Sequence, residues 1–217
     1  MLFEEIRNDI ANLGKEIATS GSNLGTWGNI SARIDENKFA ITPSGVTYEN
    51  ITTEDIVVLD LTGIIVDGNK KPSIELPLHS AIYKARKNIN TIVHTHSVYC
   101  TAFAIARKPI PAACEDMIQI VGGKVEVAEY FLPGSEELAL STVTALGNKS
   151  ACIMANHGLI TVADNLNEAY KIAQIVEKSA QAVIYANSLG GAVELSQNDI
   201  DVMRDFYLNK YGQKKNV

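Results

Sequence analysis

The chain has 217 residues, of which 46% are hydrophobic and 20% charged, an ordinary composition for a soluble globular protein. A domain of this length buries roughly 70% of its unfolded surface, so folding requires neither disulfides nor a structural metal. The net charge of −6 argues against nucleic acid or an anionic membrane as the main partner. We therefore expect one domain over residues 1–217.

The cysteines and the N-terminal residues indicate in which cellular compartment the protein is expected. Cys100, Cys114 and Cys152 lie in apolar stretches and form no CxxC pair, so we interpret them as reduced core residues. The opening MLFEEIRNDI carries early acids and no long apolar run, so we expect no signal peptide. No apolar run reaches about 18 residues, the length that would predict a membrane span. The expected location is the cytoplasm.

The first half of the chain alternates helix and strand patterns. Apolar residues at steps of three and four predict a helix over 3–17 that ends at Gly21. A glycine-punctuated stretch, SGSNLGTWGNISARI, follows at 20–34. Turn residues then separate short strands, and further patterns follow. We expect strands at 38–42, 56–60 and 64–66, a helix over 75–87, a strand at 92–95 and a helix over 97–106.

The second half continues the alternation. Ser135 is a plausible N-cap for a helix over 135–146. The strongest helix pattern covers 166–189, where Gly190 and Gly191 end it. We also expect strands at 124–130 and 151–155 and a last helix at 199–207. Because strands alternate with helices throughout and no repeat or linker interrupts them, the pattern predicts a single α/β domain.

Three of the four histidines follow apolar strands. His94 and His96 stand two residues apart in TIVHTHSV, and such side chains share one face of a strand. A single histidine here would be an ordinary core residue, but burying two requires a partner for each. His157 follows the strand at 151–155 and precedes a glycine. Three imidazoles at strand ends are typical of a divalent transition metal, most often Zn²⁺.

Glu75, in KPSIELPLHS, is the carboxylate best placed to complete such a site. It follows a Pro-Ser turn at the start of a predicted helix, where an acid also simply stabilises the helix dipole. His79 lies four residues further on and shares the helix face. We expect His79 to support the site or to pack beside it rather than to bind the metal.

Three turns offer backbone amides and hydroxyls to an anion: GTWGNIS at 25–31, TPSG at 42–45 and PS at 72–73. Consecutive N–H groups in such turns form anion-binding concavities. Each turn taken singly is equally well explained as an ordinary loop. None matches a P-loop or a GxGxxG fingerprint, so no nucleotide is indicated.

Five ordered motifs, TWGNISAR, ITPSGVTYE, PSIELPLH, IVHTHS and ANHG, together resemble the class II aldolase family of L-fuculose-1-phosphate aldolase and L-ribulose-5-phosphate 4-epimerase. The resemblance covers residues 25–211. It implies a three-layer α/β/α domain around a central mixed, largely antiparallel sheet. It also implies a homotetramer with active sites between subunits.

The resemblance assigns roles to particular residues. It places one Zn²⁺ per subunit on His94, His96, His157 and Glu75, and Glu75 doubles as an acid/base group. The family's phosphate-binding positions fall on Gly28, Asn29, Ser44, Gly45 and Ser73.

Two departures from the fuculose-phosphate aldolase pattern concern the substrate. Ile74 stands where that enzyme has a second serine, so the phosphate site loses one hydroxyl. The tyrosine that follows its IP motif is replaced here by AACEDMIQ, which offers Asp116 or Glu115 as the acid/base group. The family's C-terminal tyrosine matches Tyr211, although the tail alignment is loose.

The implied activity is zinc-dependent cleavage of a ketose 1-phosphate such as L-fuculose 1-phosphate to dihydroxyacetone phosphate and a small aldehyde. The same fold and metal site also serve sugar-phosphate 4-epimerases and methylthioribulose-1-phosphate dehydratases, and Asp116 keeps both alternatives open. A non-catalytic binding module is disfavoured because all four metal-binding positions are present. A closed structural zinc site is disfavoured because such sites are usually rich in cysteine.

Overall fold

One eight-stranded sheet runs through the computed structural model, which describes residues 1–23 and 25–212. Its strands are β1 (Asn29–Arg33), β2 (Lys38–Ile41), β3 (Val57–Asp60), β4 (Ile65–Asp67), β5 (Thr91–Thr95), β6 (Val127–Ala128), β7 (Ala151–Met154) and β8 (Gly158–Ala163). They lie in the order β4-β3-β2-β1-β5-β8-β7-β6, and all neighbours are antiparallel except the parallel pair β6 and β7.

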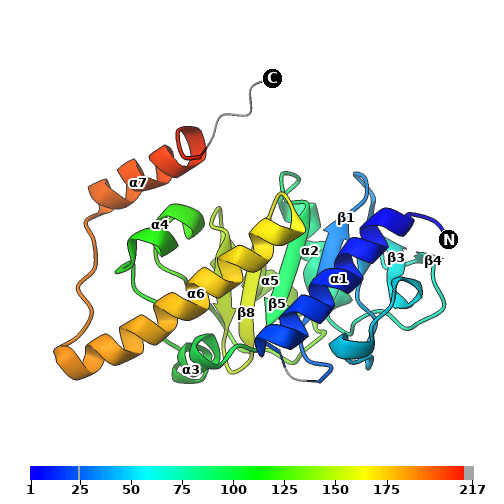
Figure 1. Cartoon of the computed structure of the whole chain (residues 1–217), viewed down its shortest axis with the longest axis horizontal. Helices are drawn as coiled ribbons and strands as arrows, with labels where there is room; N and C mark the ends of the chain where they lie inside the picture. The colour runs from blue at the N-terminus through cyan, green and yellow to red at the C-terminus, as the bar shows by residue number, and fades with distance from the viewer. Residues whose placement is uncertain (24, 213–217) are drawn as a thin grey trace.

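Helices cover both faces of this sheet (Figure 1). They are α1 (Glu4–Ser20), α2 (Leu76–Ala85), α3 (Val98–Ala106), α4 (Glu115–Val121), α5 (Glu136–Leu146), α6 (Leu166–Ala186) and α7 (Gln197–Asn209), with short 3-10 turns at Tyr48–Asn50, Thr53–Asp55 and Asn187–Leu189. The predicted three-layer α/β/α fold with a mixed, largely antiparallel sheet is confirmed. None of the described helices is long and apolar enough to cross a bilayer.

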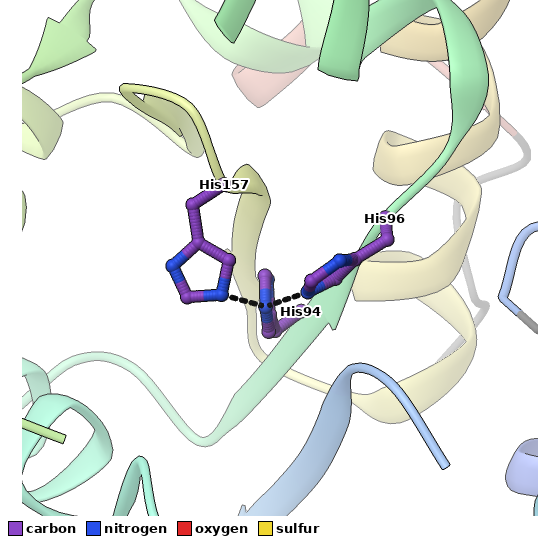
Figure 2. A group of neighbouring side chains, drawn as sticks. All are labelled: His94, His96 and His157. Carbon is purple, nitrogen blue, oxygen red and sulfur yellow. Dashed lines mark hydrogen bonds between the residues drawn. The ribbon is translucent and has the colours of Figure 1, made fainter. Parts of the chain in front are cut away.

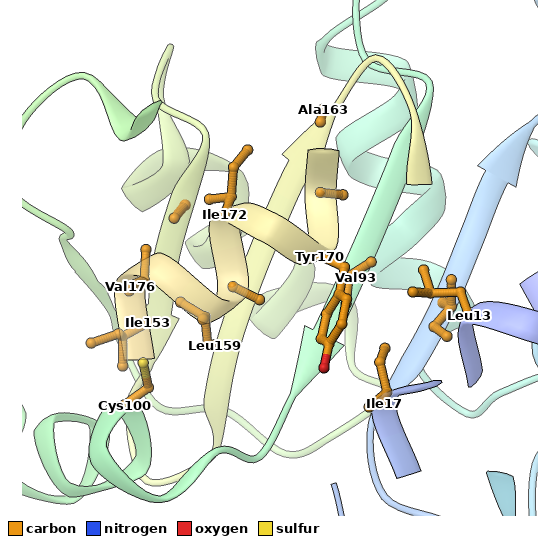
Figure 3. Close-up of a cluster of buried hydrophobic side chains, with 14 of the residues drawn as sticks. Leu13, Ile17, Val93, Cys100, Ile153, Leu159, Ala163, Tyr170, Ile172 and Val176 are labelled. Carbon is orange, nitrogen blue, oxygen red and sulfur yellow. The ribbon is translucent and has the colours of Figure 1, made fainter. Parts of the chain in front are cut away.

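The core divides into one cluster on each face of the sheet. Helices α1, α3, α4 and α6 bury their apolar stripes on one face (Figure 3). This cluster includes Leu13, Ile17, Val93, Cys100, Leu159, Ile172 and Val176. Helices α2 and α5 cover the other face, where Leu78, Ile82 and Leu138 pack on Ile92 and Ile160. Since successive strand residues point to opposite faces, His94 of β5 points to the α2 side together with Ile92.

Local signals account for most of the element boundaries. Gly21 ends α1 in the left-handed region with a φ of 75°, as the sequence predicts. The side chain of Ser135 accepts the N–H of Leu138 at the start of α5, and Asn165 accepts the N–H of Glu168 at the start of α6. These caps place both helix starts within one residue of the prediction.

Three elements were not predicted: β1, β8 and α4. The glycine-rich stretch at 20–34 obscures the pattern of β1, whose alternate residues Asn29, Ser31 and Arg33 are polar and make buried or partly buried hydrogen bonds. β8 is a continuous apolar run, buried on both faces, so it has no period of two that would mark a strand. The expected strand at 124–130 shrinks to β6, which has a neighbour on only one side.

Helix α7 packs on α4 at one end of the molecule (Figure 1). Ile200 joins Ile118 and Ala112 in a small separate cluster. The Arg204 guanidinium donates hydrogen bonds to the backbone carbonyls of Gln119 and Ile120 at the end of α4, at 2.6 and 2.9 Å.

Candidate metal centre

Three imidazoles converge at one end of β5 (Figure 2). His94 lies on β5, and His96 follows just after the strand ends at Thr95. His157 lies in the turn between β7 and β8, and β8 pairs with β5 so that Ile160 faces His94. The ligand atoms of the three rings all lie within 4.8 Å of one another. The structure thus brings together the three histidines that the sequence singled out.

The backbone around these histidines is packed too closely to admit side chains at two glycines. A Cβ on Gly158 would collide with the carbonyl oxygen of Thr95 and press on the His94 ring. A Cβ on Gly28 would collide with the carbonyl of His94, and Gly28 also has a φ of 79°. Asn23 completes the support, because its side-chain oxygen accepts the N–H of His96 at 2.7 Å. Sequence reasoning missed Asn23, which nothing in its loop distinguishes.

Burial keeps all three rings neutral at pH 7. It lowers the pKa of His94 well below its ordinary value and the pKa of His96 to about 3, with neighbouring histidines adding to both shifts. Burial also lowers the pKa of His157. His94 donates from Nδ1 to the carbonyl of Leu159 at 2.9 Å, so its Nε2 presents a lone pair to the centre.

Glu75 closes the group from the side of α2. It is the N-cap residue of that helix, but its side chain makes no capping bond. Its carboxylate oxygens lie 3.3 Å from Nε2 of His94 and 3.3 Å from Nε2 of His157. The ordinary explanation of Glu75 as a helix-end acid does not account for this orientation. The side chain is buried, and among the described residues its Oε1 has no hydrogen-bond partner.

The spacing of these ligand atoms fits a metal ion. Nε2 of His94 lies 2.9 Å from Nε2 of His96 and 3.2 Å from Nε2 of His157. Ligand atoms about 2.0–2.1 Å from a tetrahedral Zn²⁺ lie roughly 3.3–3.4 Å apart, which is close to these separations. A lone pair facing two further ring nitrogens and a buried carboxylate is costly unless a cation lies among them. Three neutral imidazoles with one carboxylate match the donor set of a catalytic Zn²⁺ or a similar transition metal.

Two of the three predicted phosphate turns lie side by side. Pro43 and Pro72 form an antiparallel bridge, in which the N–H of Ser44 donates to the carbonyl of Lys71. The N–H of Ser73 donates to the carbonyl of Thr42, so neither serine amide is free for an anion. The exposed Ser44 hydroxyl and exposed Gly45, with a φ of 75°, remain available, whereas the hydroxyl of buried Ser73 accepts the N–H of Glu75 at 3.2 Å and keeps only its proton to donate.

The side chain of Asn29 is directed to Glu75 instead of to solvent. Its Nδ2 donates to Oε2 of Glu75 at 2.7 Å, and its Oδ1 lies 2.5 Å from Nε2 of His79. His79 is fully buried and lies outside the group of possible ligands, as expected for a supporting residue. Behind it are Ser31 and Tyr83, which sequence reasoning missed. The alternation of polar residues in NISAR was the available signal.

Asp116 and Tyr211 lie apart from this centre. Asp116, in the first turn of α4 next to Glu115, forms an ion pair with Lys178 of α6. Tyr211 follows α7, is 61% exposed, and stacks on Tyr207 with ring centroids 5.4 Å apart. In the part of the chain that the structure describes, no hydrogen bond, ion pair or ring contact joins either residue to the histidines.

Comparison with known proteins agrees with this geometry. Residues 8–184 match the family described as Class II Aldolase and Adducin N-terminal domain. The chain belongs to the class II aldolase family. Among the relatives of this class II aldolase is the 5-deoxy-D-ribulose 1-phosphate aldolase of Bacillus thuringiensis, 34% identical over 99% of this chain and 100% of the relative. The L-fuculose phosphate aldolase of Escherichia coli is 36% identical over 87% of each chain.

Solved structures show the same fold. An L-fuculose 1-phosphate aldolase superimposes with a TM-score of 0.91 at 34% identity, covering 94% of this chain and 96% of that one. The L-fuculose-1-phosphate aldolase of Thermus thermophilus gives a TM-score of 0.76 at 27% identity, over 89% and 100% of the two chains. The resemblance inferred from the five motifs is therefore confirmed, and this class II aldolase is an aldehyde-lyase of the fuculose-phosphate aldolase type.

Proposed function

We propose that this enzyme is a cytoplasmic, zinc-dependent aldolase that cleaves a ketose 1-phosphate to dihydroxyacetone phosphate and a small aldehyde. The convergence of His94, His96, His157 and Glu75 beside the paired turns at 42–45 and 71–73 carries the proposal. The relatives named for L-fuculose phosphate and for 5-deoxy-D-ribulose 1-phosphate support this substrate class. Cleavage of those two sugars releases lactaldehyde and acetaldehyde, which differ by one CHOH group.

The residues divide into binding and proton transfer. The three histidines and Glu75 would hold the metal, which when bound acts as a Lewis acid on the substrate's carbonyl oxygen. When the C3–C4 bond breaks its electron pair is left at C3, and Glu75 supplies the proton that C3 then takes up. The hydroxyls of Ser44 and Ser73, with the backbone of Gly28, Asn29 and Gly45, position the phosphate. A phosphate held at one end of the substrate places C3 and C4 against the acid/base groups.

The acid/base group at the C4 hydroxyl comes from a neighbouring subunit. Asp116, with Glu115 beside it, and Tyr211 lie on the surface of one chain, away from that chain's own histidines. We propose a homotetramer in which these residues reach the site of the next subunit. Sedimentation equilibrium should give about four times the chain mass of 23.5 kDa. A monomeric mass at micromolar concentration would contradict this assembly.

A sugar-phosphate 4-epimerase or a dehydratase is the second candidate. Asp116, where fuculose-phosphate aldolase has a tyrosine, is the observation that favours it. All three reactions begin with a bound ketose phosphate and differ in the acid/base groups around it.

Product analysis distinguishes these reactions. The zinc-loaded enzyme is incubated with L-fuculose 1-phosphate, 5-deoxy-D-ribulose 1-phosphate, L-ribulose 5-phosphate and methylthioribulose 1-phosphate, and phosphorus and proton NMR spectra are followed. We expect dihydroxyacetone phosphate and an aldehyde from one of the first two. An epimerised or dehydrated phosphate without cleavage would replace the aldolase assignment by the corresponding alternative.

A further inference from the structure

A continuous line of buried polar side chains leads away from Glu75 between β1 and α2. Asn29 Nδ2 lies 2.7 Å from Oε2 of Glu75, and Asn29 Oδ1 lies 2.5 Å from Nε2 of His79. Nδ1 of His79 lies 2.6 Å from the Ser31 hydroxyl, which lies 2.8 Å from the Tyr83 hydroxyl. All five side chains are buried, and His79 and Ser31 have no exposed surface. We call these five residues the Glu75 chain.

The donor and acceptor roles of these groups fix the direction in which the hydrogen bonds of the Glu75 chain donate. A carboxylate only accepts hydrogen bonds, so Asn29 turns its NH₂ group to Glu75 and its carbonyl to His79. Nε2 of His79 must therefore carry the ring proton and donate it. The His79 ring has no exposed surface, and its two nitrogens face the Asn29 amide and the Ser31 hydroxyl, with no carboxylate of the described residues in contact to pair with a charge, so the ring is neutral and its Nδ1 is an acceptor.

The remaining two bonds then follow. The Ser31 hydroxyl has a single proton and gives it to Nδ1 of His79, so in the 2.8 Å contact Ser31 accepts the hydroxyl proton of Tyr83, whose other acceptor, the carbonyl of Asn90, lies at 3.4 Å. Every bond in the chain thus donates toward Glu75. Hydrogen bonds in such an aligned series polarise one another and strengthen the last bond, which here ends on Oε2.

We propose that the Glu75 chain is a positioning device, in which Asn29, His79, Ser31 and Tyr83 hold Oε2 of Glu75 and leave Oε1 as the oxygen that exchanges the substrate proton. Oε1 is the carboxylate oxygen without a hydrogen-bond partner among the described residues, and it faces His157 at 3.3 Å. The role of Oε1 rests on the proposed function. The direction of the hydrogen bonds in the Glu75 chain, and their hold on Oε2 of Glu75, do not depend on the proposed function.

The ring proton of His79 tests the direction of the chain. Protein labelled with ¹⁵N-histidine is examined at pH 7, with and without zinc, by long-range ¹H–¹⁵N correlation. We expect His79 as the Nε2–H tautomer and His94 as the Nδ1–H tautomer. The His79→Gln variant assigns the His79 signals. Should that variant fail to fold, His79 is recognised as the ring whose nitrogens remain unligated when zinc is added. An Nδ1–H tautomer at His79 would reverse the chain and overturn the proposal.

Removal of the Ser31 hydroxyl tests whether the Glu75 chain holds Glu75 in position. We expect Ser31→Ala to weaken zinc retention and to lower kcat, each on the order of tenfold, while KM changes little. Ser179→Ala is the matched control, because the Ser179 hydroxyl is buried and has no hydrogen-bond partner among the described residues. Zinc retention is measured by competition with a chelator, and kcat on whichever ketose phosphate the enzyme turns over.

The two readouts separate this proposal from the proposed function. If the enzyme proves to be an epimerase or a dehydratase, the tautomer of His79 and the loss of zinc in Ser31→Ala remain as expected. If Ser31→Ala retains zinc and kcat as well as Ser179→Ala does, the chain has no positioning role even in a proven aldolase.

Discussion

At the scale of single residues, the centre consists of polar groups whose burial is costly unless they have partners. Glu75 is an N-cap residue that makes no capping bond, and its buried Oε1 has no partner among the described residues. Leaving a buried carboxylate unpaired costs several kcal/mol, so a side chain in this orientation indicates a cation nearby. The same reasoning applies to His94, because its Nδ1 donates to the carbonyl of Leu159 and its buried Nε2 is left with a lone pair that needs a cation or a hydrogen-bond donor.

Replacement of one histidine should remove the metal and leave the fold intact. His96 is only partly buried and follows the end of β5, so its ring contributes less to the core than that of His94. We expect His96→Ala to lose zinc and turnover while its circular dichroism spectrum stays unchanged. Metal content after dialysis is the measurement. Full zinc occupancy in this variant would exclude His96 as a ligand.

At the scale of elements, the start of α3 is tied to α6 by one carboxylate. Glu177 accepts a hydrogen bond from the Ser97 hydroxyl at 2.7 Å, and from the N–H groups of Tyr99 and Cys100 at 2.8 Å. A negative charge at a helix N-terminus also interacts favourably with the helix dipole. Since Ser97 directly follows His96, this contact fixes the backbone on which a proposed ligand is mounted.

Removal of that charge should loosen α3. We expect Glu177→Gln to lower the free energy of unfolding by about 1–2 kcal/mol, because an amide can accept at only one of its two positions. Urea unfolding of the metal-free protein measures the change. Glu137→Gln, at an exposed acid in the first turn of α5, is the control and should change stability by less than about 0.5 kcal/mol. Equal stabilities of the two variants would contradict the capping role.

At the scale of the whole molecule, the order of the strands gathers the site. Positions 75, 94 and 157 lie far apart in the sequence, and they meet because β5 pairs with β8 on one side and with β1 on the other. The same arrangement gathers four histidines in one region, two of them buried and two partly buried, and the loss of hydration lowers the pKa of each. The folded protein therefore contains histidines that are protonated less readily than those of an unfolded chain.

The metal-free protein should lose stability in mild acid. The pKa of His79 is about 4 in the folded protein and about 6.5 in an unfolded chain, so between these values the unfolded chain binds a proton that the folded protein does not. The stability that neutral His79 allows is fully present above about pH 6.5, and the free energy of unfolding falls as the pH decreases toward 4. We expect a loss on the order of 2 kcal/mol at pH 5 relative to pH 7 from His79 alone.

Urea unfolding of chelator-treated protein at the two pH values measures this loss. His79→Gln has no ring to protonate and should show a smaller decrease. A wild-type protein equally stable at pH 5 and pH 7 would show that His79 binds a proton in the folded state.

Apart from α4, the helix positions could be predicted from the sequence, as could the fold class and the candidate metal ligands, because their signals are local or familial. The helices follow from apolar spacing and caps such as Gly21 and Ser135, and the ligands from two histidines on one strand face and a set of ordered motifs. Strands β1 and β8 could not be predicted. One is masked by glycines, and the other is apolar on both faces and so lacks a period of two.

Only the tertiary structure decided which partner each buried polar group has. The sequence by itself determined that Asn29, Ser31 and His79 exist at positions that suit several roles. Their assembly into a directed chain ending on Glu75 depends on β1 lying against α2, a contact across more than forty positions of sequence. Hydrogen bonds require distances of about 3 Å and a fixed orientation, and no spacing within the sequence encodes either for residues so far apart.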